Sequence, residues 1–102
     1  MGLTIEKSQS SNGSLIRVVG EVDLYSSPEL RKAILKAMPS AKDGLAIDLA
    51  GVTYIDSSGV ATLVEGLRSA REHGTAFALI SPSQSVMQVL ELARLDSIFE
   101  VR

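Results

Sequence analysis

The apolar positions in the first part of the chain change from a strand spacing to a helix spacing. Leu3–Lys7 and Leu15–Val19 are predicted as two short strands, and the turn residues at 10–13 between them favour a hairpin. The next apolar residues recur every three or four positions, which predicts an amphipathic helix. They are Leu30, Ala33, Ile34, Ala37 and Met38.

The start of this first helix can be predicted in two ways. Ser26 and Glu29 have the spacing of a capping box, in which each side chain binds the other residue's backbone N–H. Alternatively, Ser27 caps the helix and Pro28 takes its first position. Pro39 is expected to end the helix, because proline cannot continue its hydrogen bonds.

The second half of the chain alternates strands with helices. Strands are predicted at Leu45–Leu49, Ala76–Ile80 and Ile98–Val101. A second helix ends near Gly74, and a third opens at Pro82 and Ser83. Their apolar stripes are Val60, Leu63, Val64 and Leu67 in the second helix, and Val86, Val89, Leu90 and Ala93 in the third. Alternating strands and helices imply right-handed parallel crossovers, so we expect an α/β fold with a mixed β-sheet and helices packed on it.

Length and composition limit the class of protein. A chain of 102 residues, 45% of them hydrophobic, fits one compact domain spanning 1–102. It has no cysteine, which excludes disulfides and thiolate metal sites. The sequence shows neither a secretory signal nor an apolar run of roughly 20 residues. We therefore expect a cytoplasmic protein without membrane insertion.

Charge and aromatic content indicate the kind of partner. The net charge is -2, with basic residues scattered among acidic ones, so no basic stripe is available for nucleic acid. Two tyrosines and two phenylalanines offer few surfaces for stacking bases. No cofactor or metal site is indicated. The expected partner is a protein.

Two polar segments follow predicted strands at equivalent positions. Residues 23–26 lead from the second strand to the first helix, and residues 56–59 lead from the third strand region to the second helix. In open α/β sheets, binding sites gather beyond the carboxyl ends of parallel strands. If these two strands are parallel, Asp23 and Ser58 lie at one edge of the sheet.

A catalytic serine in Asp56-Ser57-Ser58-Gly59 is disfavoured. Such a serine needs a nearby base, and the only histidine, His73, is 15 positions from Ser58, or about 22 Å along a helix. The Gly-x-Ser-x-Gly elbow is also absent. A lysine base stays open, but we expect no catalytic residue and no enzyme activity.

The simplest alternative is structural. Ser57 or Ser58 is a good helix cap by residue type, and spacing alone favours that role. Asp56 is stabilised beside a helix N-terminus by the unpaired amides, and Asp23 suits a turn.

The order and spacing of several segments resemble the STAS domain family, and within it the bacterial anti-sigma factor antagonists that consist of this domain alone. Gly20-Glu21-Val22-Asp23 matches one family motif, and residues 49–59 match a hydrophobic strand followed by Asp-Ser-Ser-Gly. Ser81-Pro82-Ser83 and Leu92-Ala93-Arg94-Leu95 also resemble the family. The resemblance covers nearly the whole chain.

The resemblance implies a phosphorylation switch. In such antagonists an anti-sigma factor with serine kinase activity phosphorylates the second serine of Asp-Ser-Ser-Gly, here Ser58. The unphosphorylated form binds the anti-sigma factor and releases a sigma factor, and a serine phosphatase restores it. By this resemblance Asp23, Asp56, Ser57, Ser58 and Gly59 form the partner-binding surface, with Gly59 allowing close approach of the partner.

Two other functions remain open for a domain of this family. Soluble STAS proteins also resemble a subunit of a phospholipid-trafficking ABC transporter, in which the same surface would be a static docking site. A third possibility is a STAS scaffold module within a larger signalling assembly. Ser57-Ser58 favours the phosphorylation switch.

Overall fold

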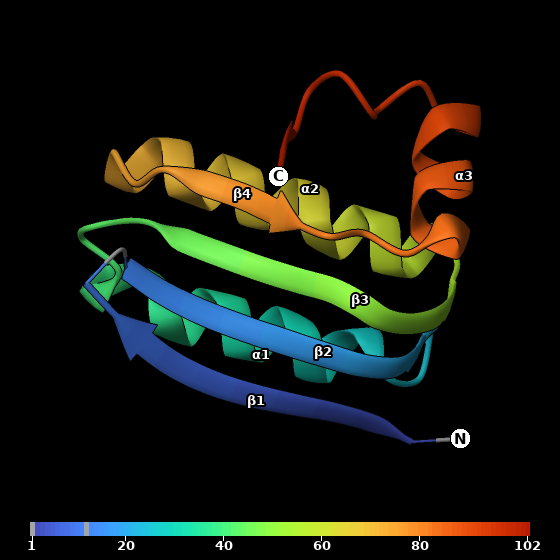
Figure 1. Cartoon of the computed structure of the whole chain (residues 1–102), viewed down its shortest axis with the longest axis horizontal. Coiled ribbons are helices and arrows are strands. Elements are labelled where there is room, and N and C mark those ends of the chain that lie inside the picture. Colours follow the sequence, from blue (N-terminus) through green and yellow to red (C-terminus); the bar gives the residue numbers. More distant parts are fainter. Residues whose placement is uncertain (1, 12) are drawn as a thin grey trace.

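The fold is a mixed sheet with two long helices on one face and a third helix at its end (Figure 1). The computed structural model describes residues 2–11 and 13–102. In these residues the strands are β1 (Leu3–Ser10), β2 (Gly13–Val22), β3 (Leu45–Ile55), β4 (Phe77–Ile80) and β5 (Glu100–Val101). The helices are α1 (Ser27–Ala37), the short 3-10 helix η1 (Met38–Ser40), α2 (Ser57–His73) and α3 (Gln84–Leu92).

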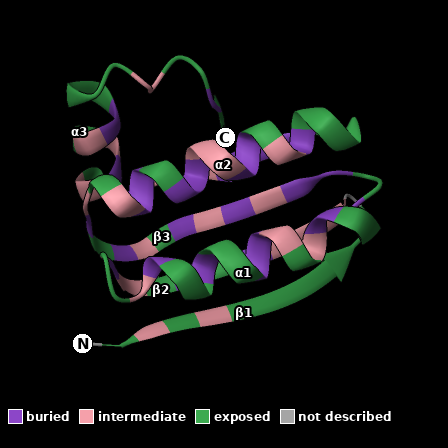
Figure 2. Ribbon diagram, turned by 180° about the vertical axis from the view of Figure 1, so that it is seen from behind, coloured by how far each residue is buried: buried purple, intermediate pink, exposed green. Residues whose placement is uncertain are grey.

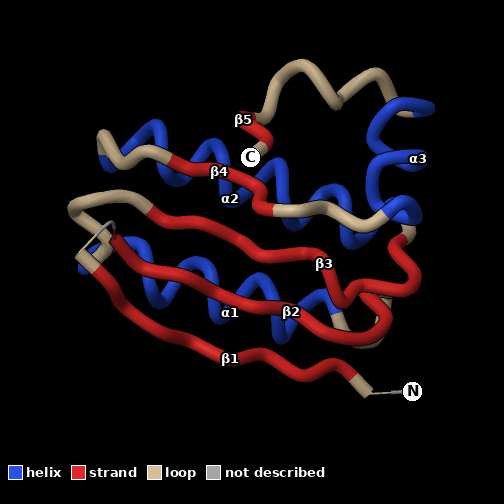
Figure 3. The backbone as a smooth tube through the Cα atoms, viewed as in Figure 1, coloured by secondary structure: helices blue, strands red, loops and turns tan. Residues whose placement is uncertain are grey.

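The sheet confirms the predicted α/β class and its mixed strand directions. Its order is β1-β2-β3-β4-β5, with β1 antiparallel to β2 and every later pair parallel. The predicted hairpin is confirmed by the pairing of Ser10 with Gly13, while Asn12 of its turn lies outside the described residues. Because β2, β3 and β4 are parallel, the ends of β2 and β3 lie at the same edge of the sheet (Figure 3).

Several strands differ in length from the prediction. β2 continues to Val22 and β3 to Ile55, beyond the apolar runs that indicated them. The pairing of β2 with β3 shifts register at two places, between Arg17 and Val19 and between Gly20 and Glu21. These irregularities break the strict alternation of buried and exposed positions, so the strands appear shorter in the sequence than they are.

The apolar stripes of α1 and α2 face the sheet, as predicted (Figure 2). Leu30, Ala33 and Ile34 of α1 are buried, and so are Val60, Leu63 and Leu67 of α2. They join one core with the inward side chains of the central strands, which are Ile16, Val18, Ile47, Leu49 and Leu79. This packing fixes both helices, and therefore their N-termini, relative to the sheet edge.

The predicted caps of α1 are wrong. Ser26 is the cap residue by position, yet its side chain makes no capping bond, so neither the Ser26–Glu29 box nor a Ser27 cap forms. Instead the Ser26 hydroxyl donates to the carbonyl of Glu21 at 2.7 Å. The backbone N–H of Ser27 donates to the carbonyl of Asp23 at 2.8 Å. The Ser26 hydroxyl and the Ser27 N–H therefore find their hydrogen-bond acceptors at the end of β2 and in the turn before the helix.

The predicted end of α2 and the predicted start of α3 are confirmed. Gly74 ends α2 in the left-handed conformation, with φ 67°, which favours glycine. Ser83 caps α3, and its hydroxyl also donates to the Val52 carbonyl at 2.6 Å. This bond attaches the start of α3 to β3. The last strand is shorter than predicted and holds only Glu100 and Val101.

Candidate functional site

The two polar segments meet at one edge of the sheet, as predicted. Val22 pairs with Ile55 at the ends of β2 and β3, so Asp23 and Asp56 follow paired residues of parallel strands. The backbone N–H of Asp56 donates to the Val22 carbonyl at 3.1 Å, which ties the two segments together. The site is therefore built from the β2–α1 and β3–α2 connections.

Asp56 is the N-cap of α2. Its backbone is extended, and its Oδ1 accepts hydrogen bonds from the backbone N–H of Ser58 at 3.0 Å and of Gly59 at 3.2 Å. These amides have no partner within the helix, so a carboxylate at this position is favoured by both hydrogen bonding and the helix dipole. The interpretation of Asp56 as a residue held by helix amides is confirmed.

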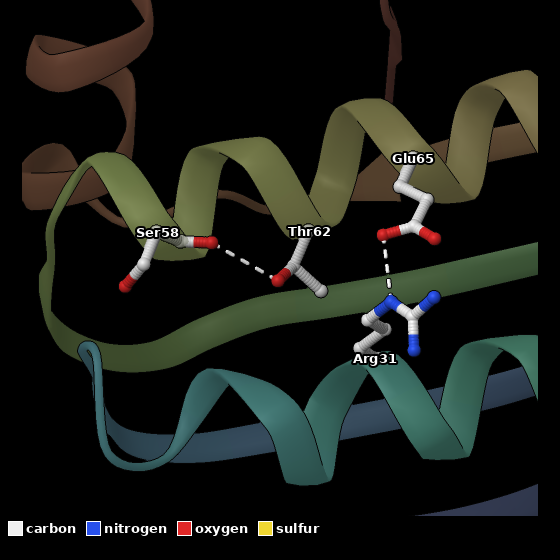
Figure 4. Close-up of polar contacts among 4 residues, drawn as sticks. All are labelled: Arg31, Ser58, Thr62 and Glu65. Carbon is white, nitrogen blue, oxygen red and sulfur yellow. Dashed lines mark hydrogen bonds and ion pairs between the residues drawn. The ribbon is translucent and has the colours of Figure 1, made fainter.

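The alternative in which a serine caps α2 is wrong. Ser57 and Ser58 are the first two residues of the helix, after the cap. Ser57 is exposed, and Ser58 is half-buried with its hydroxyl directed toward the loop before the helix (Figure 4). Ser58 Oγ donates a hydrogen bond to Asp56 Oδ1 at 2.6 Å. The hydroxyl thus binds the cap residue rather than the helix amides.

A second aspartate organises the neighbouring turn. Asp23 Oδ1 accepts the backbone N–H groups of Tyr25 and Ser26, each at 2.9 Å. The predicted turn role of Asp23 is therefore confirmed. The Ser26 hydroxyl in addition donates to the Glu21 carbonyl, which ties the turn to the end of β2.

Both carboxylates are held in their ionised form. The Ser58 hydroxyl, followed by the Gly59 and Ser58 amides, lowers the pKa of Asp56 below its ordinary value of 3.8. The Leu24 amide lowers the pKa of Asp56 further. The Ser26 amide is the main cause that lowers the pKa of Asp23, while the charge of Asp56 acts in the opposite direction. The edge therefore presents two negative charges at neutral pH.

The packing of α2 against the strands requires glycine at position 59. It is buried, and a Cβ built on it would lie 2.6 Å from Ile55 Cγ1 and 2.8 Å from Val22 Cγ1. Such distances are shorter than real Cβ contacts. Glycine therefore lets the first turn of α2 sit against the ends of β2 and β3, and its approach to a partner stays a prediction.

His73 lies at the far end of α2 from the serines. It is the last residue of the helix and is exposed, and its Nδ1 lies 2.8 Å from the carbonyl of Ser69. A histidine in this place cannot activate Ser58, because proton transfer needs hydrogen-bond distance.

Two polar contacts hold the first turns of α2, one within the helix and one to α1. The Thr62 hydroxyl donates to the Ser58 carbonyl at 3.0 Å (Figure 4). One turn further on, Arg31 Nε of α1 donates to Glu65 Oε1 at 2.8 Å. These contacts fix the helix that carries Ser58.

The apolar surface beside the two aspartates was not predicted from the sequence. Leu24 and Tyr25 are 66% and 90% exposed, and Tyr54 is 50% exposed. All three lie within two residues of Asp23 or Asp56 along the chain. Apolar residues directly beside a polar turn were the available signal, because large exposed side chains, tyrosine above all, are common in interfaces. We call Leu24, Tyr25 and Tyr54 the apolar rim.

A groove of about 710 Å³ begins at Ser57 and continues along α2. Val60, Val64 and Arg68 line it from the helix, and Leu35 and Leu95 line it from other elements. Ser57 therefore lies at one end of a groove with both apolar and charged lining residues.

The described part of the chain holds no cluster of three or more His, Cys, Asp or Glu side chains placed to bind a metal ion. None of the helices formed by residues 2–11 and 13–102 combines the length and the apolar content of a membrane-spanning helix.

Comparison with known families identifies the class of protein. The family model described as "Mlab, STAS domain" matches residues 5–100. The chain therefore belongs to the STAS domain family, which confirms the resemblance seen in its motifs.

Two similar proteins of this family carry the name anti-sigma-B factor antagonist. The chain is 28% identical over 103 residues to the anti-sigma-B factor antagonist of Bacillus subtilis, covering 99% of this chain and 92% of the relative. It is 30% identical over 105 residues to the protein of the same name from Listeria monocytogenes, covering 100% of this chain and 90% of the relative.

Solved structures confirm the fold. An anti-sigma factor antagonist from Mycobacterium paratuberculosis has a TM-score of 0.88 and 24% identity, covering 98% of this chain and 85% of its own. The antagonist SpoIIAA has a TM-score of 0.79 in its unphosphorylated form, with 21% identity and 97% and 88% of the two chains covered. In its phosphorylated form the values are 0.74, 20%, 97% and 91%.

Proposed function

We propose that this protein is an anti-sigma factor antagonist that is switched by phosphorylation of Ser58. The unphosphorylated chain binds an anti-sigma factor that carries serine kinase activity, and this binding releases a sigma factor in the cytoplasm. Phosphorylation ends the binding, and a serine phosphatase reverses it. The chain is thus the substrate of a kinase and does not turn over a substrate of its own.

One observation carries this proposal. The Ser58 hydroxyl stands at the N-terminus of α2 and binds only the side chain of the cap residue among the hydrogen bonds of the described residues. A phosphate at such a position is close to backbone amides and to the positive end of the helix dipole, so the fold can hold it. The two relatives named anti-sigma-B factor antagonist match this chain over 92% and 90% of their own length, which supports the same function.

Charge explains why the modified form would lose its partner. Phosphate adds a charge of about -1.5 to -2 at neutral pH. That charge would join the carboxylates of Asp23 and Asp56 on one surface. An interface that accommodates two negative charges and a hydroxyl must then desolvate three charged groups, which costs affinity.

The apolar rim supplies the area that such an interface needs. Tyr25 and Leu24 project from the turn held by Asp23, and Tyr54 stands at the end of β3. Rigidly presented tyrosines are frequent binding hot spots. The proposed partner-binding residues are Asp23, Asp56, Ser57, Ser58 and Gly59. Gly59 also places the helix, and the rim adds apolar contact.

The decisive experiment is to map the phosphate. The purified protein is incubated with the cognate anti-sigma factor and ATP, and the modified residue is located by mass spectrometry. We expect a single phosphate on Ser58 and none on Ser58→Ala. Phosphate found only on Ser57, or none with a partner whose binding has been verified, would contradict the proposal.

A second candidate function has one observation in its favour. The family model that matches residues 5–100 is described as "Mlab, STAS domain", not by the name of the antagonists. The transporter subunit considered in the sequence analysis would use the same surface as a static docking site. In that case the protein would bind a transporter ATPase, and no partner would phosphorylate Ser58.

A further inference from the structure

The hydroxyl of Ser58 already has an acceptor for its proton. Ser58 Oγ lies 2.6 Å from Asp56 Oδ1 and donates to it, which is short for a hydrogen bond and typical of a hydroxyl on a carboxylate. A hydroxyl that attacks phosphorus must lose this proton as the new bond forms. The geometry therefore places a base on the nucleophile before any partner binds.

Two other candidate bases, His73 and Asp23, are distant or bound to other groups. His73 is at the opposite end of α2. The second acid of this edge, Asp23, directs its Oδ1 to the amides of Tyr25 and Ser26 and to the Ser26 hydroxyl. The hydrogen bond of Ser58 Oγ goes to Asp56, so this carboxylate is the chain's own proton acceptor at the serine.

We propose that Asp56 of this protein acts as a general base for phosphorylation of its own Ser58. This inference rests on the proposed function. Ser58 Oγ attacks the γ-phosphorus of a nucleoside triphosphate held by the partner, and the Oγ–P bond forms. The bond from that phosphorus to the bridging oxygen breaks, and its electron pair leaves with the nucleoside diphosphate. The proton of Ser58 passes to Asp56 Oδ1.

The position of Asp56 suits a transfer in which the proton moves late. The transition state of phosphoryl transfer is loose, so a base at the attacking oxygen must align that oxygen as well as receive its proton. The helix amides hold the Asp56 carboxylate in place, and the carboxylate in turn holds the Ser58 hydroxyl. The same bond therefore orients the nucleophile and receives its proton.

The test is the variant Asp56→Asn. Its amide oxygen can still accept the N–H groups of Ser58 and Gly59, because asparagine is as good a cap as aspartate. It cannot take up the proton. With the cognate partner kinase and Mg-ATP, we expect kcat for phosphorylation of this protein to fall about 100-fold, the lower end of the usual effect of a general base. Because Asp56 also belongs to the proposed binding surface, kcat is measured at saturating concentrations of this protein, where a change of KM or of partner affinity does not enter it.

A matched control makes the same chemical change elsewhere. Asp43→Asn alters an exposed aspartate just before β3, at the end of that strand opposite the site, and should leave kcat and KM unchanged. If Asp56→Asn does not fold, Asp56→Ser keeps a preferred capping side chain without a carboxylate and serves in its place.

The outcomes separate this inference from the proposed function. Phosphorylation of Asp56→Asn with the kcat of the unaltered protein would overturn the assignment of the base, while phosphate on Ser58 would still support the switch. Failure of a verified partner to phosphorylate the unaltered protein would overturn the proposed function itself. A loss of partner affinity in Asp56→Asn equal to its loss of kcat/KM would assign Asp56 to binding and reject its role as base.

Discussion

At the scale of single residues, Asp56 has three roles in the site. It caps α2, binds the hydroxyl of Ser58 and contributes one of the two negative charges of the site. Ser58 has no capping role, so its side chain can be modified without removing the bonds that start the helix. This division between a residue that holds the helix and a residue that carries the signal can be tested by substitution.

We expect Asp56→Ala to lower the free energy of unfolding by about 1 kcal/mol, the usual cost of losing a helix cap. Ser58→Ala should cost less, because the cap bonds to the Ser58 and Gly59 amides remain. Chemical denaturation of the two variants measures the difference. A larger loss in Ser58→Ala than in Asp56→Ala would show that the hydroxyl, and not the carboxylate, starts the helix.

Acid should destabilise the protein through the same carboxylates. Since the pKa values of Asp23 and Asp56 are lowered in the folded chain, the unfolded chain binds more protons in the range just below its own pKa of about 3.8. The stabilisation is therefore complete above that pKa and is lost as pH falls through the folded values. Unfolding followed from pH 6 to pH 2 should show this decline.

The variant Asp56→Asn is the control for the acid effect, since it removes one titrating group and keeps the cap. Its stability should fall less steeply with acid than that of the unaltered protein. Identical pH profiles for the two proteins would mean that the pKa of Asp56 is not lowered by folding.

At the scale of elements, the sheet edge brings the site together. The parallel pairing of β2 and β3 brings the β2–α1 and β3–α2 connections together. The packing of α2 against the core fixes the position of Ser58 beside them. The close packing at Gly59 is the point where this arrangement is most sensitive. Any side chain there must displace the ends of two strands.

We expect Gly59→Ala to destabilise the fold by about 1–3 kcal/mol, the usual cost of overpacking a core. The added Cβ would overlap side chains of Val22 and Ile55. Thermal unfolding compared with Ser57→Ala, a change at an exposed position in the same turn, measures it. A Gly59→Ala protein as stable as the parent would show that glycine is there for another reason, such as access for a partner.

The elements were largely predictable from the sequence, whereas the caps were not. The 3.6-residue spacing in α1 and α2 identified the buried faces because helix packing depends on that spacing directly. Serine, aspartate and asparagine are nearly equal as caps, so residue type could not decide between Asp56 and the serines that follow it. The choice depended on where β3 ends, and an irregular strand concealed that point.

The site was predictable in position but not in full extent. Asp23 and the 56–59 segment could be placed together because parallel strands bring their ends to one edge. The hydrogen bond from Ser58 to Asp56 depends on a side-chain rotamer that no spacing specifies. Tyr25 could equally have been a core residue, and only the structure shows it 90% exposed.

At the scale of the whole molecule, the proposed switch changes the charge of one surface and leaves the folded core as it is. Helices α1 and α2 share one core and are joined at the surface by the ion pair of Arg31 and Glu65. A phosphate on Ser58 would lie outside that core, so we expect it to change binding without changing the fold. SpoIIAA, solved in phosphorylated and unphosphorylated forms, has the same fold as this chain in both.

The most direct test of the central claim is the affinity of the unmodified and the Ser58-phosphorylated protein for the verified anti-sigma factor, measured by titration calorimetry at one salt concentration. Thermal unfolding of both forms is recorded alongside. The account predicts that phosphorylation weakens the complex at least about tenfold, equivalent to about 1.4 kcal/mol, while the fold stays intact. Equal affinities of the two forms would contradict it.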